Sequence, residues 1–318
     1  MKILVTGGAG YIGSHVVMLL CEVGHDVVVL DDLSLGNKDT VDKRASFIEG
    51  TILNDEDLSK SLSGVNVVVH LAAYKSAGES MKNPLKYTKN NIDGSISLLR
   101  SMVEHNVKNI IFSSTAAVYG LPEYLPLDEK HPLKPINHYG YTKLQTEKTI
   151  DLYSKEKQIR YINLRYFNAA GYDSQGRISS VEKNPANLIP SILEVASGIR
   201  DKLFVYGNDF DTIDGTGVRD YVHVSDLARA HLAAIDALST RQSATINLGS
   251  EKQYSVMEVI KSTEKITGRK IPYKVVERRK GDPDRIYASS ENALNLLGWS
   301  AKESELDNII ETTWRIYK

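Results

Sequence analysis

The chain has 318 residues, and 39 lysines and arginines against 40 aspartates and glutamates give it a net charge of −1. This balance disfavours nucleic acid and anionic membranes as partners, because both attract proteins with a surplus of positive charge. The single cysteine, Cys21, excludes an internal disulfide and is typical of a reducing compartment. We expect a cytoplasmic protein of two lobes, without a signal peptide or a membrane-spanning segment.

The first 32 residues have the pattern of a dinucleotide-binding unit. The apolar run Lys2–Thr6 predicts a buried strand, Gly7–Gly13 has the spacing G-x-G-x-x-G, and Ile12–Cys21 has helical periodicity. Glycine is needed there because a Cβ would hold a pyrophosphate away from the N–H groups at the start of the helix. A second strand, Asp26–Leu30, leads into Asp31, whose carboxylate suits ribose hydroxyls and repels a 2′-phosphate. The pattern therefore predicts NAD and not NADP.

Strand and helix patterns then alternate through the first half of the chain. The segments with these patterns are strands at Ser46–Glu49, Val65–Leu71, Asn109–Ser113 and Arg160–Phe167, and helices at Pro84–Glu104 and Tyr139–Lys157. The alternation predicts an α/β fold with a Rossmann-like, doubly wound parallel sheet. Ligands of such sheets bind beyond the carboxyl ends of the strands. The residues there are Leu71–Ala73, Ser113–Thr115 and Tyr166–Asn168.

The regular alternation weakens from about Gly171. Loops lengthen, and glycines and aspartates cluster between Asp209 and Asp220. We expect residues 1–170 to form an NAD-binding domain and residues 171–318 a smaller, mixed α/β substrate lobe. The pattern leaves open whether later segments such as Tyr221–Val224 rejoin the main sheet.

Tyr139 and Lys143 are the first candidates for catalysis. They lie four residues apart near the start of a predicted helix, and therefore on one face of it. A lysine ammonium beside a phenol favours the phenolate and lowers its pKa, and a phenolate can act as general base toward a hydroxyl. Tyr-x-x-x-Lys pairs are also common on helix surfaces, but this one follows a dinucleotide pattern and the polar strand end Ser113–Thr115. Thr115 is positioned to donate a hydrogen bond to the oxygen being oxidised.

Several motifs together carry a resemblance to a known family. In Thr6–Ser14, Phe112–Gly120, Tyr139–Lys143 and Arg165–Gly171 the chain resembles the extended short-chain dehydrogenase/reductase family. Its second half is similar to the members that epimerise nucleotide sugars. The segments concerned are Asn187–Pro190, Tyr206–Asp209, Asp214–Val224 and Arg278–Asp282. The resemblance covers essentially the whole chain.

The resemblance implies an activity and an assembly. A UDP-hexose would be oxidised at C4 by NAD to a 4-keto sugar, would rotate in the site, and would be reduced again on its opposite face. This reaction interconverts UDP-galactose and UDP-glucose with no net oxidation, and its extension to UDP-N-acetylhexosamines is a further hypothesis. Tyr139 would be the base for the 4-hydroxyl, Thr115 would bind the same oxygen, and Lys143 would also contact the nicotinamide ribose. A homodimer joined through the helices near residues 84–105 and 139–157 is expected.

The resemblance also assigns two sets of binding residues. Those expected at the cofactor are Gly7, Gly10, Tyr11, Ile12, Gly13, Asp31, Asp32, Thr51, Ile52, Leu71, Ala72, Ala73, Lys75, Asn90, Tyr139, Lys143 and Phe167. Those expected at the UDP-sugar are Thr115, Tyr139, Asn168, Asn187, Leu188, Phe204, Val205, Tyr206, Arg219, Arg279, Asp282 and Ile286. Two arginines suit a diphosphate, because a guanidinium can donate to it through two N–H groups.

Two positions depart from the family pattern. Thr51 follows Gly50 where the family has an aspartate that contacts adenine, so we expect a weaker or re-routed adenine contact. Ile286 occupies the position where side-chain bulk controls the entry of N-acetylated sugars. Because isoleucine is smaller than the tyrosine of some members, it predicts some tolerance of UDP-N-acetylglucosamine.

Other activities on the same scaffold are disfavoured by particular residues. A nucleotide-sugar 4,6-dehydratase needs an acid–base pair directly after the threonine, where this chain has Ala116 and Ala117. A decarboxylase or reductase is disfavoured by the segment Asp214–Val224. A non-catalytic NAD sensor would not need Tyr139 and its partners. No metal is expected, because the histidines lack the spacing of metal ligands.

Overall fold

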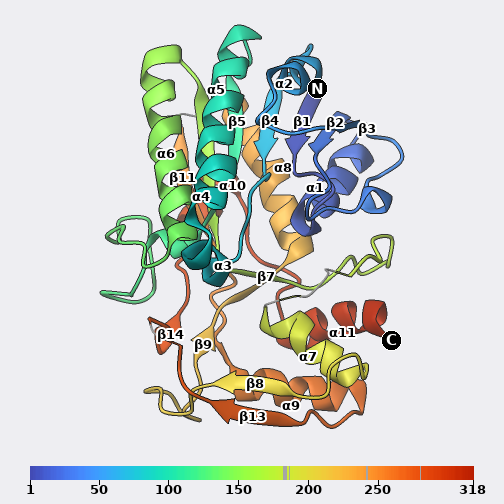
Figure 1. The fold of residues 1–318 in the computed structure, drawn as a ribbon, viewed down its shortest axis with the longest axis vertical. Coiled ribbons are helices and arrows are strands. Elements are labelled where there is room, and N and C mark those ends of the chain that lie inside the picture. The colour runs from blue at the N-terminus through green and yellow to red at the C-terminus, as the bar shows by residue number, and fades with distance from the viewer. Residues whose placement is uncertain (182–184, 186, 241–242, 280) are drawn as a thin grey trace.

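The computed structural model of the chain describes residues 1–181, 185, 187–240, 243–279 and 281–318. Two lobes are stacked along the long axis of the molecule (Figure 1). The upper lobe contains the N-terminus and a large sheet flanked by helices. The lower lobe contains short strands and the C-terminal helix, and we refer to the region between the two lobes as the waist. Of the residues 278–282 that carry part of the family resemblance, Lys280 lies outside the described residues.

The upper lobe is built on a seven-stranded sheet whose recorded pairs are all parallel. In spatial order its strands are β11 (Ala244–Leu248), β6 (Arg160–Tyr166), β5 (Asn109–Thr115), β4 (Val67–His70), β1 (Lys2–Thr6), β2 (Asp26–Asp31) and β3 (Ser46–Glu49). Along β1, Ile3 and Val5 belong to one core cluster and Leu4 to another, because successive side chains point to opposite faces. The predicted doubly wound α/β fold is confirmed.

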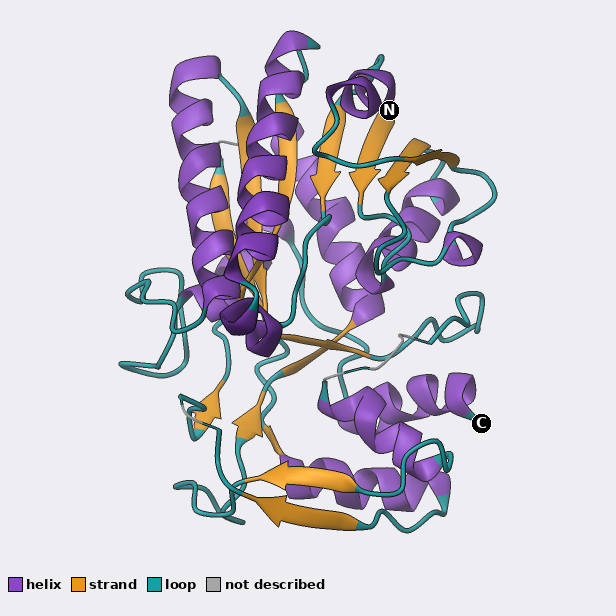
Figure 2. Cartoon of the chain, viewed as in Figure 1, coloured by secondary structure: helices purple, strands orange, loops and turns teal. Residues whose placement is uncertain are grey.

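Helices cover both faces of this sheet (Figure 2). The helices on one face are α1 (Tyr11–Glu22), α8 (Val224–Thr240) and α10 (Glu291–Leu297). Those on the other are α2 (Asp55–Leu62), α5 (Gly94–Glu104) and α6 (His138–Lys157). Burial on both sides explains why the strands are almost continuously apolar in sequence.

The helix predicted at Pro84–Glu104 is continuous but not regular. It consists of α4 (Pro84–Tyr87), a π-helical segment (Thr88–Asp93) and α5, and it follows the short helix α3 (Ala77–Lys82). The wider π-helical turn brings Asn91 into a buried position, where its side-chain oxygen accepts the N–H of Tyr74 at 2.9 Å. The loop that follows β4 is thereby fixed to the helix.

Three smaller sheets follow β6. The strand β7 (Asn168–Ala170) pairs with β10 (Tyr221–His223) at the waist. The pair of β8 (Leu203–Tyr206) and β13 (Tyr273–Val276) lies at the far end of the lower lobe, and β9 (Val218–Arg219) lies between β12 (Tyr254–Ser255) and β14 (Arg285–Ile286). The lower core is completed by the helices α7 (Leu188–Ala196), α9 (Val256–Thr267) and α11 (Leu306–Tyr317).

The expected division at residue 170 does not describe the whole path of the chain. Tyr221–His223 pairs with β7 and stays outside the main sheet, whereas β11 joins that sheet at its edge. The helices α8 and α10 also pack in the upper lobe. The second half of the chain therefore contributes to both lobes.

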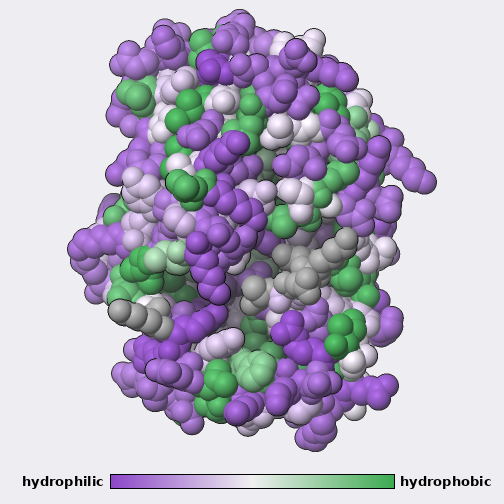
Figure 3. Space-filling model, in the orientation of Figure 1, coloured by the Kyte–Doolittle hydropathy of each residue, from purple (hydrophilic) through white to green (hydrophobic). Residues whose placement is uncertain are grey.

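The surface is predominantly hydrophilic on the face shown in Figure 3, which is hollowed between the two lobes. Within the described residues, we find no helix with the length and apolar character needed to cross a membrane.

Candidate active site

A cavity of about 460 Å³ opens at the carboxyl ends of β1, β2 and β4. Its lining contains every residue that the sequence assigned to the cofactor except Phe167. Phe167 follows Tyr166, which lines the cavity, but its own side chain is buried in a cluster with Tyr119 and Leu144. The volume lies within the range of about 300–1,000 Å³ that is usual for ligand sites. The predicted residues thus converge from six separate segments onto one cavity.

The glycine loop is shaped by close packing. Gly7 has a φ of +74°, and a Cβ there would lie 2.6 Å from the backbone nitrogen of Ala72. A Cβ at Gly13 would lie 2.2 Å from the carbonyl oxygen of Gly7. Gly10 is the N-cap residue of α1, and no side chain of the described residues caps this helix. Its first N–H groups are therefore directed to the cavity, as in sites for phosphate groups.

Asp31 is fixed at the end of β2 by the glycine loop itself. Its carboxylate accepts the N–H of Ala9 and the N–H of Leu33, each at 2.9 Å. Burial raises the pKa of this carboxyl, and the two hydrogen bonds oppose that effect. The remaining acceptor positions face a cavity that suits a ribose diol.

Thr51 is engaged by its own loop. Its N–H donates to Asp57 at 2.9 Å, and its hydroxyl oxygen accepts the N–H of Leu53 at 3.3 Å. The hydroxyl group therefore keeps its proton for donation, whereas a carboxylate at this position could only accept. This geometry is in line with the expected change in the adenine contact.

Tyr139, Lys143 and Thr115 are brought together by α6 and β5. The side chain of Asn137 caps α6 by accepting the N–H of Gly140 at 2.8 Å, which fixes the first turn that carries Tyr139. Lys143 Nζ donates to the carbonyl of Ser113 at 2.8 Å. Thr115, at the end of β5, is close enough to the Tyr139 phenol to lower its pKa. Tyr139 and Lys143 line the cavity, and Thr115 lies beside Tyr139 without lining it.

The pKa values of this group differ from the sequence-based expectation. Burial raises the pKa of Tyr139 to about 12, although the hydrogen bond with Thr115 acts in the opposite direction. Burial also lowers the pKa of Lys143 to about 7, opposed by the negative charge of Glu147. Desolvation is the largest effect at both groups, because Lys143 is buried and Tyr139 is half-buried in the cavity wall. The chain by itself therefore holds Tyr139 as a neutral phenol, and ionisation depends on bound ligands.

A buried ion pair that the sequence analysis did not identify lies one helical turn beyond Lys143. Glu147 accepts two hydrogen bonds from Arg165, at 2.9 and 2.6 Å, and a third from the hydroxyl of Ser114. Arg165 also donates to the phenol oxygen of Tyr119 at 3.1 Å. Both charged side chains are almost fully buried. The signal in the sequence was an arginine inside a strand that was predicted to belong to the buried sheet.

The proposed substrate residues lie around the waist and the lower lobe. Phe204 and Tyr206 project from one side of β8 and are partly exposed, whereas Val205 between them is buried in the lower core. Only the backbone of Val205 is left for a ligand. Leu188 packs at the edge of the same core, and Asn187 is the N-cap residue of α7.

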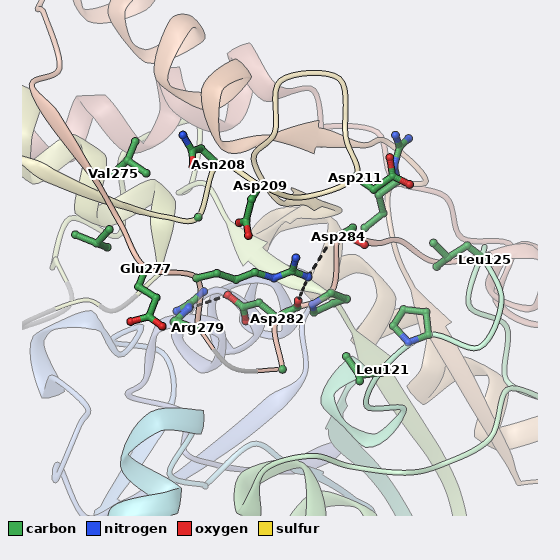
Figure 4. Close-up of a pocket in the computed structure, with 17 residues that line it drawn as sticks. Leu121, Leu125, Asn208, Asp209, Asp211, Val275, Glu277, Arg279, Asp282 and Asp284 are labelled. Atoms are coloured by element: carbon green, nitrogen blue, oxygen red, sulfur yellow. Dashed lines mark hydrogen bonds and ion pairs between the residues drawn. The ribbon is translucent and has the colours of Figure 1, made fainter.

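The two arginines are held differently. Arg219 Nη1 donates to the carbonyls of Val218 at 2.9 Å and Pro283 at 3.0 Å. Arg279 is exposed, and its Nε donates to the carboxylate of Asp282 at 2.8 Å (Figure 4). The lower lobe therefore offers two guanidinium groups to an anionic ligand, one from β9 and one from the loop between β13 and β14.

A second, open hollow of about 1270 Å³ lies beside these arginines. Of the residues predicted for the substrate, Arg279 and Asp282 line it, together with Glu277 and the loop around Asp209 (Figure 4). Leu121 and Leu125 form the opposite wall. The structure does not gather the predicted substrate residues into one closed cavity, because they are spread over β7, α7, β8, β9 and β14.

The doubly wound sheet, the glycine loop and the group around Tyr139 define a dinucleotide-dependent enzyme that acts on a hydroxyl. The model of the NAD dependent epimerase/dehydratase family matches residues 3–249, and the chain belongs to this family. The chain is 46% identical to the UDP-glucose 4-epimerase of Lactobacillus helveticus, over 100% of this chain and 97% of that protein.

Solved structures give the same result. The crystal structure of UDP-glucose 4-epimerase from Brucella ovis in complex with NAD matches with a TM-score of 0.97 and 40% identity, covering 99% of this chain and 98% of that one. The corresponding enzyme from Bifidobacterium longum in complex with NAD+ and UDP matches with a TM-score of 0.94 and 37% identity, covering 99% and 98%.

Proposed function

We propose that this chain is an NAD-dependent epimerase that interconverts UDP-galactose and UDP-glucose by inverting C4 of the hexose. The observation that carries the proposal is the placement of Tyr139 in the cavity formed by the glycine loop, with Thr115 close to its phenol. The full-length similarity to UDP-glucose 4-epimerases supports the same activity. Any hydride removed from C4 is returned in the same turnover, so no external oxidant is consumed.

The chain's own residues have distinct tasks in this reaction. The oxygen of Tyr139 takes the proton of the 4-hydroxyl and later returns it, as a general base and then a general acid. Thr115 binds the same oxygen, since its own oxygen already accepts the N–H of Ala117 at 3.2 Å and its proton is left for donation. Lys143 donates to the carbonyl of Ser113 and lines the cavity, which supports a contact with the nicotinamide ribose. NAD, when bound, accepts and returns the hydride and adds a positive charge that favours the phenolate.

The residues of the cavity fit NAD. The uncapped start of α1 suits the pyrophosphate, and the carboxylate of Asp31 suits the ribose hydroxyls and disfavours the extra phosphate of NADP. Arg219 and Arg279 supply the donors that a UDP diphosphate needs. The exposed rings of Phe204 and Tyr206 offer faces against which a uracil can stack.

The dehydratase alternative is not favoured. Its acid–base pair would stand at Ala116 and Ala117, which form a short 3-10 helix directly after Thr115. Neither side chain can donate or accept a proton, so water elimination from C5 and C6 has no catalyst at that place. The ordered arrangement of Tyr139 and Thr115 likewise disfavours a non-catalytic sensor.

We further propose that the site tolerates UDP-N-acetylhexosamines to some extent. Ile286 packs against the buried cluster that contains Ala116 and Phe167. Ala116 directly follows Thr115 in the chain. The side chain of Ile286 therefore borders the place where the hexose must rotate. An isoleucine leaves more room there than a tyrosine would.

We also propose a cytoplasmic homodimer joined through α4, α5 and α6. These helices lie on one side of the molecule (Figure 1). Large apolar side chains are exposed on them, namely Leu85 at 82%, Ile96 at 39% and Leu152 at 56%, together with Tyr141. Apolar side chains that are exposed on neighbouring helices are typical of a surface covered by a partner.

One product analysis tests the proposed function. The purified protein is incubated without added oxidant, separately with UDP-galactose and with UDP-N-acetylglucosamine. Formation of UDP-glucose from the first substrate is the expected result. A 4-keto-6-deoxy product would instead indicate a dehydratase, and NAD-loaded protein without turnover would indicate a sensor. Activity on the acetylated sugar that appears only in Ile286→Ser would show that isoleucine excludes it.

A further inference from the structure

Asp220 lies where three sheets of the molecule meet. It stands between β9 and β10, so its backbone links the β12–β9–β14 sheet to the β7–β10 sheet. Its side chain reaches the loop that follows β11, the edge strand of the main sheet. The residue is fully buried. A buried carboxylate is costly unless its oxygens are hydrogen-bonded, so its partners show what the residue holds in place.

Neutral donors from two segments surround this carboxylate. Oδ1 accepts the N–H of Ser250 at 2.8 Å and its hydroxyl at 2.6 Å. Oδ2 accepts the N–H of Glu251 at 3.2 Å and that of Ala288 at 3.3 Å. A Cβ added at Gly249 would lie 2.5 Å from Oδ2, so the loop approaches this closely only because residue 249 is glycine. One side chain thereby ties the loop after β11 to the segment after β14.

The backbone of Asp220 holds two of the proposed substrate residues. Its carbonyl accepts both the N–H and the side-chain amide of Asn168, at 3.1 and 2.9 Å. This pair of bonds fixes the orientation of the amide. The N–H of Asp220 donates to the carbonyl of Ile286 at 3.2 Å. Arg219 precedes Asp220 in the chain and is paired with Ile286 between β9 and β14.

We propose that Asp220 is a positioning residue for the nucleotide sugar. Its carboxylate fixes the relative arrangement of Asn168, Arg219 and Ile286. The inference rests on the proposed function, since these three residues are assigned to the substrate there. Among the described residues, no hydrogen bond joins Asp220 to Tyr139, Thr115 or Lys143. Loss of the carboxylate therefore affects substrate binding more than the chemical step.

The test is the Asp220→Asn variant of the purified protein with its cofactor. The amide keeps the size of the side chain but directs an NH₂ group at N–H donors, which breaks at least one contact. With UDP-galactose we expect KM to rise about tenfold, equal to about 1.4 kcal/mol. We expect kcat to fall by less than about threefold and the NAD content per chain to stay unchanged. Ser250→Ala removes only the hydroxyl donor and should raise KM about threefold, which preserves the test if Asp220→Asn fails to fold.

Asp226→Asn is a control at a second buried carboxylate, which differs from Asp220 in also pairing with Arg229. Asp226 is also fully buried and accepts the N–H groups of Lys302 and Glu303, each at 2.9 Å, and the hydroxyl of Ser304 at 2.6 Å. These contacts lie at the start of α8 and involve none of the proposed substrate residues. The control should lose stability without a change in KM.

The outcomes separate the two proposals. An unchanged KM in Asp220→Asn and Ser250→Ala, or an equal rise in Asp226→Asn, would overturn the role of Asp220 while wild-type epimerisation stands. Absence of wild-type turnover of UDP-galactose would refute the proposed function itself, and the positioning role with it.

Discussion

The buried pair of Glu147 and Arg165 gives the sharpest prediction about stability. Glu147→Gln leaves the size of the side chain nearly unchanged but removes the charge that balances Arg165. Breaking a buried pair by removing one partner costs about 3–5 kcal/mol. Because the amide oxygen of glutamine still accepts one hydrogen bond, we expect a loss of about 3 kcal/mol in the free energy of unfolding. For a chain of this size, an unfolding entropy of about 2.1 cal/mol/K per residue converts that loss to a Tm lower by about 4–5 °C.

The assay is thermal and urea unfolding of the NAD-saturated protein, followed by circular dichroism. Asp151→Asn is the control, because Asp151 lies on the same helix and pairs with Lys155 at 2.6 Å, but both side chains are exposed. Exposed pairs contribute about 0–1 kcal/mol, so this variant should lose little. Equal losses in the two variants would refute the argument that burial makes the Glu147 pair important.

Three further predictions address the chemistry, the pH dependence and the assembly. Tyr139→Phe should retain its NAD, measured after denaturation of the protein. Its kcat should fall by about 10²–10⁴-fold, which is the usual contribution of a general base. Near-normal turnover would remove Tyr139 from that role. Burial lowers the pKa of His231 to about 4 in the folded protein. On acidification the unfolded chain therefore takes up this proton before the folded protein does. The free energy of unfolding should fall as the pH decreases from about 6.5 to 4, by up to about 3 kcal/mol from this group. Urea titrations at several pH values should show a smaller slope for His231→Phe than for wild type, and parallel slopes would contradict the assignment. Leu85→Asp should convert the proposed dimer to a monomer in light scattering, while Leu294→Asp, at another exposed leucine on α10, should not. An unchanged mass for Leu85→Asp would place the interface elsewhere.

The upper lobe could be predicted closely from the sequence. The strands β1 to β6 and the helices α1 and α6 lie within a few residues of their expected positions. Their signals are strong because each strand is buried on both faces and is nearly continuous in apolar residues. Beyond the glycine loop and Asp31, the residues expected at the cofactor came from the family resemblance, and the strand pattern added only that ligands of such sheets bind beyond the carboxyl ends of the strands.

The lower lobe and the electrostatics were harder to predict. The strands β9, β12 and β14 contain two residues each and have no periodicity that a pattern could detect. The return of β11 to the main sheet depends on long-range pairing with β6, to which local sequence gives no clue. The raised pKa of Tyr139 likewise depends on how completely the fold excludes water, and the Tyr-x-x-x-Lys spacing carries no information on that.

The path of the chain between the lobes constrains how the protein can move. After β7 the chain enters the lower lobe, returns for α8 and β11, descends for β12 to β14, returns for α10 and ends below in α11. A clamshell opening about one hinge would strain all these crossings together. The loop that includes Ile178 and Ser180 lines the cofactor cavity from the other side, and Ser180 accepts a hydrogen bond from Asn37 across it at 2.9 Å. We therefore expect the dinucleotide to exchange only through local loop displacement, and so to remain bound over many catalytic cycles.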